Sequence, residues 1–388
     1  MTERLYYDNA YLTEFDAWVT DVRSDGWIAL DRSAFYPTSG GQPFDTGRLN
    51  AAAVTDVEVE DGVVWHRTDA PFAVGQAVHG VIDWPRRFDH MQQHAADHML
   101  AGAAWQLYGG VTIGLHLGRE DSTIDMDLPG GRTHLTQEEI DALETLVNRR
   151  VQQDDPIRCW FPEAEELSRL PLRKRPTVTE HVRVVAMGDY EMVACGGTHP
   201  ASTGQIGLVK VISSTPARGK MRLCFVAGMR AVAYIQRAAR CAVQVSQALS
   251  ADFDTAAEAL QKERDAVQTA RRELSVRLTQ AALQALCMGK QGNIYAGHLE
   301  FADHETLLHA AAELTREPGA VALLSCPHKA GRMLVFARGA QADADMAALM
   351  RFSGGRGGGK PDMAQGSAPD GDALRKAAAS LGAAPEIL

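Results

Sequence analysis

The stretch MQQHAADHML, residues 91–100, places His94 and His98 four residues apart within an apolar pattern. Apolar residues recur at intervals of three and four over residues 86–108, which predicts an amphipathic helix packed on a core. Residues four apart lie on one helix face about 6 Å apart, so two imidazoles there can bind one ion. His90 lies four residues before His94, and at ~1.5 Å per residue His90 and His98 are about 12 Å apart. Spacing alone leaves open which neighbour pairs with His94.

A second motif, ACGGTHP at residues 194–200, carries a cysteine and a histidine at the same spacing. Gly196 and Gly197 make this loop flexible enough to turn both side chains inward. The Cys195 thiolate and the His199 imidazole suit Zn²⁺, which prefers tetrahedral nitrogen and sulfur ligands. The six cysteines of the chain are scattered without a CxxC pair, so we expect reduced thiols. Together the two motifs suggest a zinc site; the alternative is that they are ordinary interior residues.

The patterns on either side predict an α+β chain of four parts. Residues 1–84 alternate with period two and contain the turn-rich loop AFYPTSGGQPFDTG, so we expect a small barrel-like β domain. Residues 85–230 combine helix patterns with strands such as VTIGLHLG and STIDMDL, which predict a hairpin in a mixed α+β domain. Residues 231–286 lack Pro and Gly and predict long helices, either a dimerisation surface or a spacer. Residues 287–388 predict a small α/β domain.

Composition and charge limit the classes of function. With 45% hydrophobic and 23% charged residues among 388, the chain has globular values. It has no run of 18 apolar residues and no basic start followed by an apolar run, so we expect a cytoplasmic protein without a membrane partner. A net charge of −10 requires any nucleic-acid binding to use local patches. Residues 201–240 contain no Asp or Glu, and they form either such a patch or a solvated basic face.

Three motifs resemble one known family. HAADH followed roughly a hundred residues later by CGGTH resembles the paired metal motifs of the alanyl-tRNA synthetase editing domain and of its free-standing relatives, the AlaX proteins. FYPTSGGQPFDTG is similar to the glycine-rich motif of the β domain before that editing domain. GGRGGGKPDMAQG, residues 354–366, resembles the glycine-rich motif of the family's C-terminal domain. The motifs stand in the family's order over nearly the whole chain, which therefore resembles a long-form AlaX protein.

The resemblance implies particular site residues. It assigns the metal ligands to His94, His98, Cys195 and His199, with Zn²⁺ as the cofactor. Thr112 matches the position of a threonine that hydrogen-bonds the hydroxyl of a misattached serine. Gln42, the second candidate catalytic residue, would order the loop beside the site.

The same resemblance implies a trans-editing hydrolase that removes serine from mischarged tRNA(Ala) without ATP, with glycine as a second candidate substrate. The basic stretch 210–240 and the C-terminal glycine-rich motif would bind the tRNA. FYPTSGGQ begins within 40 residues of the start, so we expect no aminoacylation activity. If all four ligands bind zinc at once, the site is closed like a structural one.

Two alternatives remain from the sequence. One is a zinc hydrolase of another aminoacyl-tRNA or of a small ester or amide. The other is a non-catalytic RNA-binding module with a structural zinc. A homodimer through the helical connector or the C-terminal domain is a further expectation.

Overall fold

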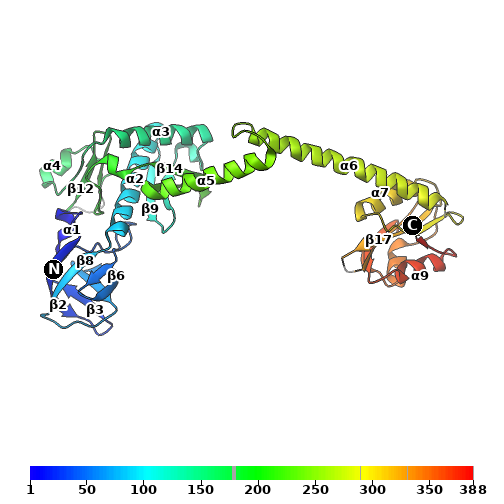
Figure 1. The fold of residues 1–388 in the computed structure, drawn as a ribbon, viewed down its shortest axis with the longest axis horizontal. Coiled ribbons are helices and arrows are strands. Elements are labelled where there is room, and N and C mark those ends of the chain that lie inside the picture. Colours follow the sequence, from blue (N-terminus) through cyan, green and yellow to red (C-terminus); the bar gives the residue numbers. More distant parts are fainter. Residues whose placement is uncertain (177–180, 289, 330, 388) are drawn as a thin grey trace. The chain divides into compact units, whose positions relative to one another are not determined.

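The chain forms two compact units, residues 1–243 and 244–388. Helices and strands are mixed in both units, so the predicted α+β class is confirmed (Figure 1). Within the described residues, no helix combines the length and the apolar character needed to cross a bilayer. The computed structural model describes residues 1–176, 181–288, 290–329 and 331–387.

A closed β-barrel opens the first unit, as the period-two alternation predicts. On strand β2, Phe15, Ala17 and Val19 point into the barrel while the residues between them are exposed, because successive strand side chains face opposite sides. The short elements Glu3–Arg4 (β1), Leu5–Asp8 (α1) and Arg32–Ser33 (β4) lie beside it. In barrel order, the strands are Glu14–Val22 (β2), Trp27–Leu30 (β3), Val63–Thr68 (β7), Ala52–Glu60 (β6), Gly47–Leu49 (β5) and Ala77–Ile82 (β8).

Helix α2, Trp84–Tyr108, follows the barrel directly, and the helix predicted from the apolar spacing is confirmed. The Asp83 side chain accepts a hydrogen bond from the amide of Arg86, which caps the first turn. The helix ends at Gly109, whose φ of 67° is the left-handed conformation that favours glycine. Every side chain over residues 93–104 is buried, so α2 is the centre of this unit's core.

Two antiparallel sheets and a helix contact α2. The four-stranded sheet has the order β14, β15, β10, β9, and its β9–β10 hairpin is the predicted one. Thr136 is the N-cap residue of helix α3 and forms a capping box with Glu139. The bounds are Val111–Leu117 (β9), Ser122–Asp127 (β10), Pro129–Gly131 (η1), Gln137–Gln153 (α3), Ile157–Trp160 (β11), Ala164–Arg169 (α4), Val184–Met187 (β12), Glu191–Ala194 (β13), Thr203–Ile206 (η2), Val209–Ala217 (β14) and Lys220–Ala227 (β15).

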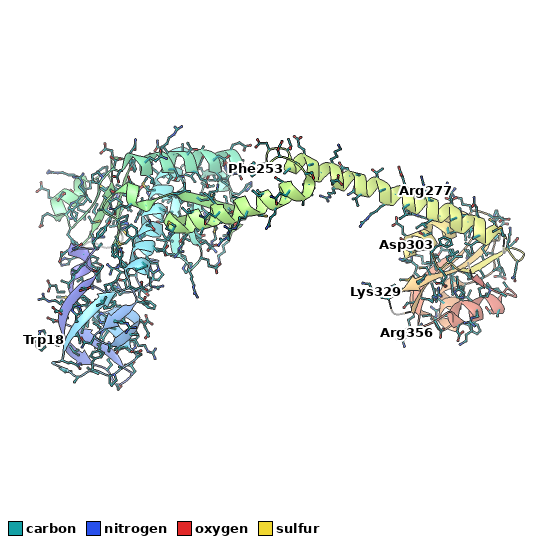
Figure 2. All side chains as sticks on the ribbon, in the orientation of Figure 1. Trp18, Phe253, Arg277, Asp303, Lys329 and Arg356 are labelled. Atoms are coloured by element: carbon teal, nitrogen blue, oxygen red, sulfur yellow. The ribbon has the colours of Figure 1, made fainter. Side chains whose placement is uncertain are left out.

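Long helices follow, as the absence of Pro and Gly predicts. Helix α5 spans Gly228–Leu249, and α6 spans Ala256–Met288 in the second unit. Apolar side chains on α6, among them Leu260 and Val267, are exposed, and Phe253 in the turn before α6 is 70% exposed (Figure 2). The role of this segment in dimerisation stays a prediction.

The second unit contains a six-stranded sheet with the order β19, β20, β18, β17, β16, β21. Along β17, Leu323 packs with α8 and α9 on one face and Leu324 packs with α6 and α7 on the other, so helices cover both faces. The bounds are Ile294–His298 (β16), His304–Leu314 (α7), Val321–His328 (β17), Gly331–Arg338 (β18), Met346–Phe352 (α8), Arg356–Gly359 (β19), Met363–Ala368 (β20), Asp372–Ser380 (α9) and Glu386–Ile387 (β21).

The glycine-rich run is largely strand rather than loop. It forms the antiparallel pair β19–β20, beginning at the exposed Arg356 (Figure 2). A Cβ on Gly357 would lie 2.0 Å from the carbonyl oxygen of Gln365, which is closer than any real contact. Glycine is therefore required there by the approach of the neighbouring strand, a packing reason that the sequence pattern did not reveal.

Candidate metal centre

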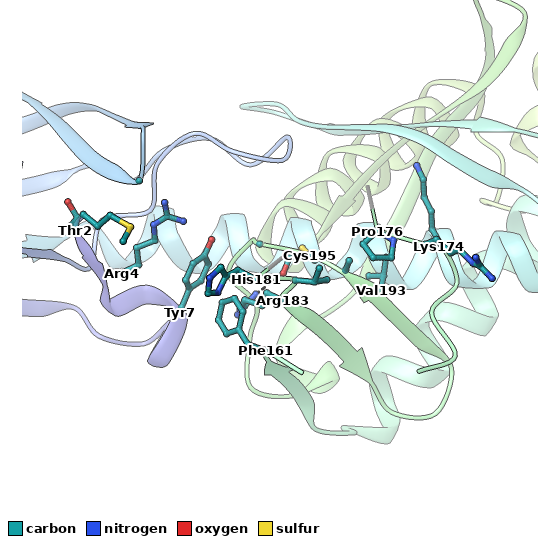
Figure 3. A pocket seen from close by; sticks show the side chains of 16 residues that line it. Thr2, Arg4, Tyr7, Phe161, Lys174, Pro176, His181, Arg183, Val193 and Cys195 are labelled. Carbon is teal, nitrogen blue, oxygen red and sulfur yellow. Dashed lines mark hydrogen bonds between the residues drawn. The ribbon is translucent and has the colours of Figure 1, made fainter. Parts of the chain in front are cut away.

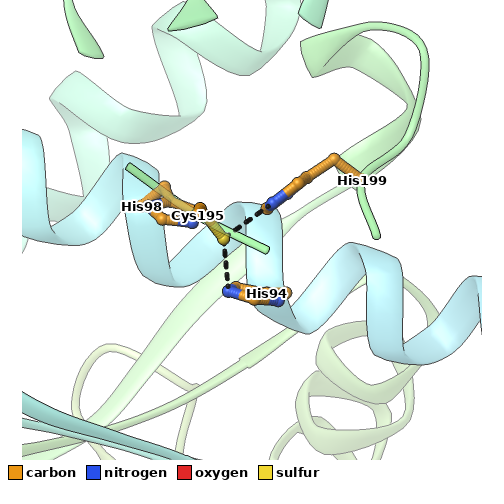
Figure 4. Close-up of side chains that lie close together, drawn as sticks. All are labelled: His94, His98, Cys195 and His199. Atoms are coloured by element: carbon orange, nitrogen blue, oxygen red, sulfur yellow. Dashed lines mark hydrogen bonds between the residues drawn. The ribbon is translucent and has the colours of Figure 1, made fainter. Parts of the chain in front are cut away.

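Four side chains from two distant segments meet inside the first unit (Figure 4). His94 and His98 come from α2, and Cys195 and His199 come from the loop after β13. Each offers one ligand atom, and these atoms all lie within 4.8 Å of one another. Cys195 Sγ is 3.4 Å from His94 Nε2 and 3.3 Å from His199 Nε2. Three nitrogens and one sulfur so arranged can hold a metal ion that accepts tetrahedral coordination.

The unsatisfied polar atoms of this cluster fit a metal site. Both ring nitrogens of His98 and the Nδ1 atom of His199 are buried without a hydrogen-bond partner in the described part of the chain. Buried polar atoms are rarely left without partners, and a metal ion would supply one for a ring nitrogen of His98. His90, one turn earlier on α2, is also buried but does not belong to the cluster.

Burial sets the protonation states of these ligands. It lowers the pKa of His94 to about 3, and the positive charge of Arg183 adds to the effect. Burial likewise lowers the pKa values of His98 and His199 well below the usual range. These imidazoles are therefore neutral near pH 7, which is the form that binds metals. Burial raises the pKa of the Cys195 thiol to about 12, so its thiolate forms only when a cation is bound nearby.

Gln42 joins the glycine-rich loop of the barrel to this cluster. Its Oε1 atom accepts hydrogen bonds from His94 Nδ1 at 2.8 Å and from the Thr198 amide at 3.2 Å, and its Nε2 donates to Thr198 Oγ1 at 2.8 Å. Because His94 donates through Nδ1, its Nε2 atom is left to face Cys195. A Cβ on Gly197 would lie 2.2 Å from the His94 ring, so only glycine permits this approach.

Arg183 supports the CGGTH loop from the other side. Its Nη1 atom donates to the carbonyl oxygens of Cys195 at 3.1 Å and Gly197 at 2.7 Å, and its guanidinium lies 5.2 Å from the centre of the Tyr7 ring. Sequence reasoning missed this residue, because nothing in VRVVAM distinguishes it from an ordinary strand arginine.

Thr112 lies on β9, outside the four-residue cluster, and is held by Arg173. Arg173 Nη1 donates to Thr112 Oγ1 at 3.2 Å, while its Nε donates to both carboxylate oxygens of Glu191 at 3.0 Å. The Arg173 and Glu191 side chains are 9% and 1% exposed, so the ion pair is buried. Since Arg173 occupies an acceptor site of the threonine hydroxyl, the hydroxyl hydrogen remains for another partner. The charge of Arg173 also lowers the pKa of His98.

Asp97 is a second residue that sequence reasoning missed. It stands on α2 immediately before His98, inside the HAADH motif itself, and it is buried. Burial raises its pKa to about 7, a rise that Arg173 partly offsets. Its Oδ1 atom has no hydrogen-bond partner among the residues that the structure describes.

A cavity of about 680 Å³ lies beside Cys195 (Figure 3). The rings of Tyr7 and Phe161, with centres 5.5 Å apart, line one part of it. Its lining, as far as the chain is described, contains no Asp or Glu. The cations in the lining are Arg4, Lys174, Arg175 and Arg183.

The basic stretch 201–240 contains seven Lys and Arg residues, and part of its charge is neutralised within the fold. Acidic residues from distant segments pair with four of its cations, which the local sequence could not reveal. The pairs are Lys210 with Glu144, Lys220 with Asp127, Arg222 with Asp125 and Arg230 with Asp89.

Comparison with known proteins agrees with the resemblance to alanyl-tRNA synthetases. Residues 8–86, which include Gln42, match the class II (A) tRNA synthetase family, and residues 182–223, which include Cys195 and His199, match the second additional domain of threonyl and alanyl tRNA synthetases. The chain is 31% identical to the alanine-tRNA ligase of Thermococcus kodakarensis, covering 94% of this chain and 41% of that protein. It is 32% identical to the alanine-tRNA ligase of Halorubrum lacusprofundi, covering 100% of this chain and 44% of that protein.

A third relative, the alanine-tRNA ligase of Methanoregula boonei, is 33% identical over 96% of this chain and 42% of its own length. The chain is thus related to alanyl-tRNA synthetases and spans less than half the length of these relatives. The finer prediction of a free-standing AlaX protein stays a prediction.

Proposed function

We propose that this chain deacylates mischarged Ser-tRNA(Ala), and also Gly-tRNA(Ala), at a zinc ion bound by His94, His98, Cys195 and His199. The observation that carries the proposal is the buried cluster of these four side chains. The match of residues 182–223 to the second additional domain of threonyl and alanyl tRNA synthetases supports it, because that match contains two of the ligands.

The metal ligands and the residues that contact them have different roles in the proposed hydrolysis. A zinc ion bound there would polarise the ester carbonyl and lower the pKa of a bound water. Gln42 orients His94, and Arg183 holds the loop that carries Cys195 and His199. Cys195 is the least buried of the four ligands and lines the cavity, so the substrate approaches from its side.

Thr112 supplies the discrimination between serine and alanine. With Arg173 donating to its oxygen, the Thr112 hydroxyl donates its hydrogen to the serine hydroxyl. Alanine has no such group, and a site built to hydrogen-bond a hydroxyl rejects the analogue without it far better than an apolar pocket rejects an extra methylene.

The cavity beside Cys195 has the chemistry to receive the acceptor end of the tRNA. Single-stranded nucleotides stack on aromatic rings, here those of Tyr7 and Phe161, while cations bind the phosphates. The site would thus recruit RNA through a local basic surface despite the net charge of −10.

Deacylation assays on Ser-tRNA(Ala), Gly-tRNA(Ala) and Ser-tRNA(Thr) test the proposal. We expect hydrolysis of the first two by the wild type and its loss in Cys195→Ala. Cys224→Ala, which changes another half-buried cysteine of the same unit, is the matched control and should stay active. Bound zinc without hydrolysis would instead support a structural metal, and selective cleavage of Ser-tRNA(Thr) would redirect the substrate assignment.

A further inference from the structure

A small cavity in the second unit lies at the carboxyl ends of parallel strands. Strand β16 pairs in parallel with β17 on one side and with β21 on the other. The connection to β17 runs through α7 on one face of the sheet, whereas α9, which precedes β21, packs on the opposite face. His298 ends β16 where these connections diverge. In open α/β sheets, ligands bind in the crevice at such a point.

The cavity has a volume of about 250 Å³ and is rich in hydrogen-bond donors. Arg332 Nη1 is buried and has no hydrogen-bond partner within the described ranges. The acidic residue in the lining, Glu300, is already paired with Arg332. Arg375 pairs with Asp372 at 3.0 Å, but this pair is exposed and therefore weak, so its guanidinium can turn to a ligand. The lining consists of His298, Glu300, Arg332, Gly371, Arg375 and Pro385.

The imidazole of His298 lines this cavity and can serve as a hydrogen-bond donor. Its side chain is only 6% exposed, and its Nδ1 lies 2.6 Å from Oγ of the fully buried Ser325. The Ser325 hydroxyl can donate this hydrogen bond to Nδ1. The ring proton is then on Nε2, because the partner of one nitrogen sets the tautomer. Nε2 faces Gly371, where a Cβ would lie only 3.1 Å away.

The first turn of α9 begins beside this cavity, which Gly371 and Arg375 line. Gly371 is the N-cap residue of this nine-residue helix, and no side chain caps it. Asp370 accepts from the Asp372 amide, while the next amides of the turn have no intrahelical carbonyl to bind. Such an end attracts anions through its free amides and the helix dipole.

We infer that this cavity binds the phosphate group of a ligand, either a phosphodiester of RNA or a free phosphate ester. His298 Nε2, the Arg332 and Arg375 guanidiniums and the first turn of α9 converge as donors, which suits an anion with several acceptor oxygens. Arginine forks in particular match phosphate geometry. The site lies in the second unit and makes no use of the proposed zinc centre.

Calorimetric titration of the full chain with inorganic phosphate tests the inference. We expect the wild type to bind phosphate. Arg375→Gln should bind it at least about tenfold more weakly, because a hydrogen bond to a charged group is lost. Gly371→Ala should also weaken binding, since its Cβ occupies the space beside His298, while its φ of −79° suits alanine. Arg316→Gln is the matched control, because Arg316 forms a similar exposed pair with Glu313.

Equal affinity of the wild type and Arg375→Gln for phosphate, or no binding by the wild type, would overturn the inference. Fluorescence anisotropy with labelled tRNA then separates the two sources. If the ligand is RNA, Arg375→Gln binds tRNA more weakly and phosphate competes with it. If the ligand is a free phosphate ester, tRNA binding is unchanged and adenosine 5′-monophosphate binds to the wild type but poorly to the variant. Neither readout requires deacylation, so this inference and the proposed function fail separately.

Discussion

Gln42 on the barrel accepts a hydrogen bond at 2.8 Å from Nδ1 of His94 on α2, and the same amide holds Thr198 of the CGGTH loop. One buried side chain thereby joins both ligand-bearing segments. Residues that orient a metal ligand in this way commonly affect metal affinity without touching the metal.

Replacing Gln42 should therefore weaken metal binding. We expect Gln42→Ala to lower zinc affinity about 10–100-fold, because the His94 ring loses the partner that fixes its orientation. Competition with a chromophoric chelator measures this directly. Gln76→Ala, at an exposed glutamine of the same barrel, should leave the affinity unchanged. Unaltered affinity in Gln42→Ala would show that the loop holds the ligands without this contact.

Replacing Thr112 should change the selectivity between Ser-tRNA and Ala-tRNA more than the rate of hydrolysis. Thr112→Val keeps the shape of the side chain but removes the hydroxyl, so the preference for Ser-tRNA over Ala-tRNA should fall by at least about tenfold. The ratio of kcat/KM for the two substrates is the measurement. Thr123→Val on the neighbouring strand β10 serves as the control. A preserved ratio in Thr112→Val would contradict the assigned role.

Breaking the buried pair of Arg173 and Glu191 should destabilise the first unit. Arg173→Met leaves an unpaired carboxylate in the interior, so we expect a loss of about 3–5 kcal/mol in the free energy of unfolding, measured with urea. Arg169→Met breaks an exposed pair with Glu165 and should cost less than about 1 kcal/mol. Adding Glu191→Gln to Arg173→Met should recover part of the loss, and no recovery would argue against an unpaired charge as the cause.

Stability should fall at acid pH because of buried histidines, and His66 in the barrel offers a clear case. Burial lowers its pKa from 6.5 to about 4, and its Nε2 lies 2.7 Å from Ser33 Oγ. Between these pH values the unfolded state binds the proton more strongly. The contribution of neutral His66 to the free energy of unfolding is therefore fully present above about pH 6.5 and is lost as the pH falls toward 4. The shift corresponds to about 3 kcal/mol.

His66→Gln removes this titrating group, so its unfolding free energy should depend less on pH across that window than that of the wild type. Urea unfolding at a series of pH values measures the difference in slope, independently of any uniform destabilisation. His116→Gln, at an exposed histidine of strand β9, should keep the wild-type loss at acid pH. Equal slopes for the wild type and His66→Gln would mean that His66 is not buried as a neutral ring.

Local patterns determined much of the fold. The spacing of apolar residues predicts helix α2, and alternation predicts the barrel and the β9–β10 hairpin, because burial of one face imposes a period on the sequence. The resemblance of HAADH and CGGTH to known motifs named the four candidate ligands, although spacing alone could not choose between His90 and His98.

Tertiary structure decided what depends on segments far apart in the chain. It brought Gln42 to His94, paired four cations of the basic stretch with acidic residues of other helices and strands, and turned the glycine-rich run into a strand pair. It also buried Asp97 and Arg173 near the site, which gives them their electrostatic influence. A local pattern reports which face of an element is buried, whereas partners, pKa values and cavities depend on what the folded chain packs against that face.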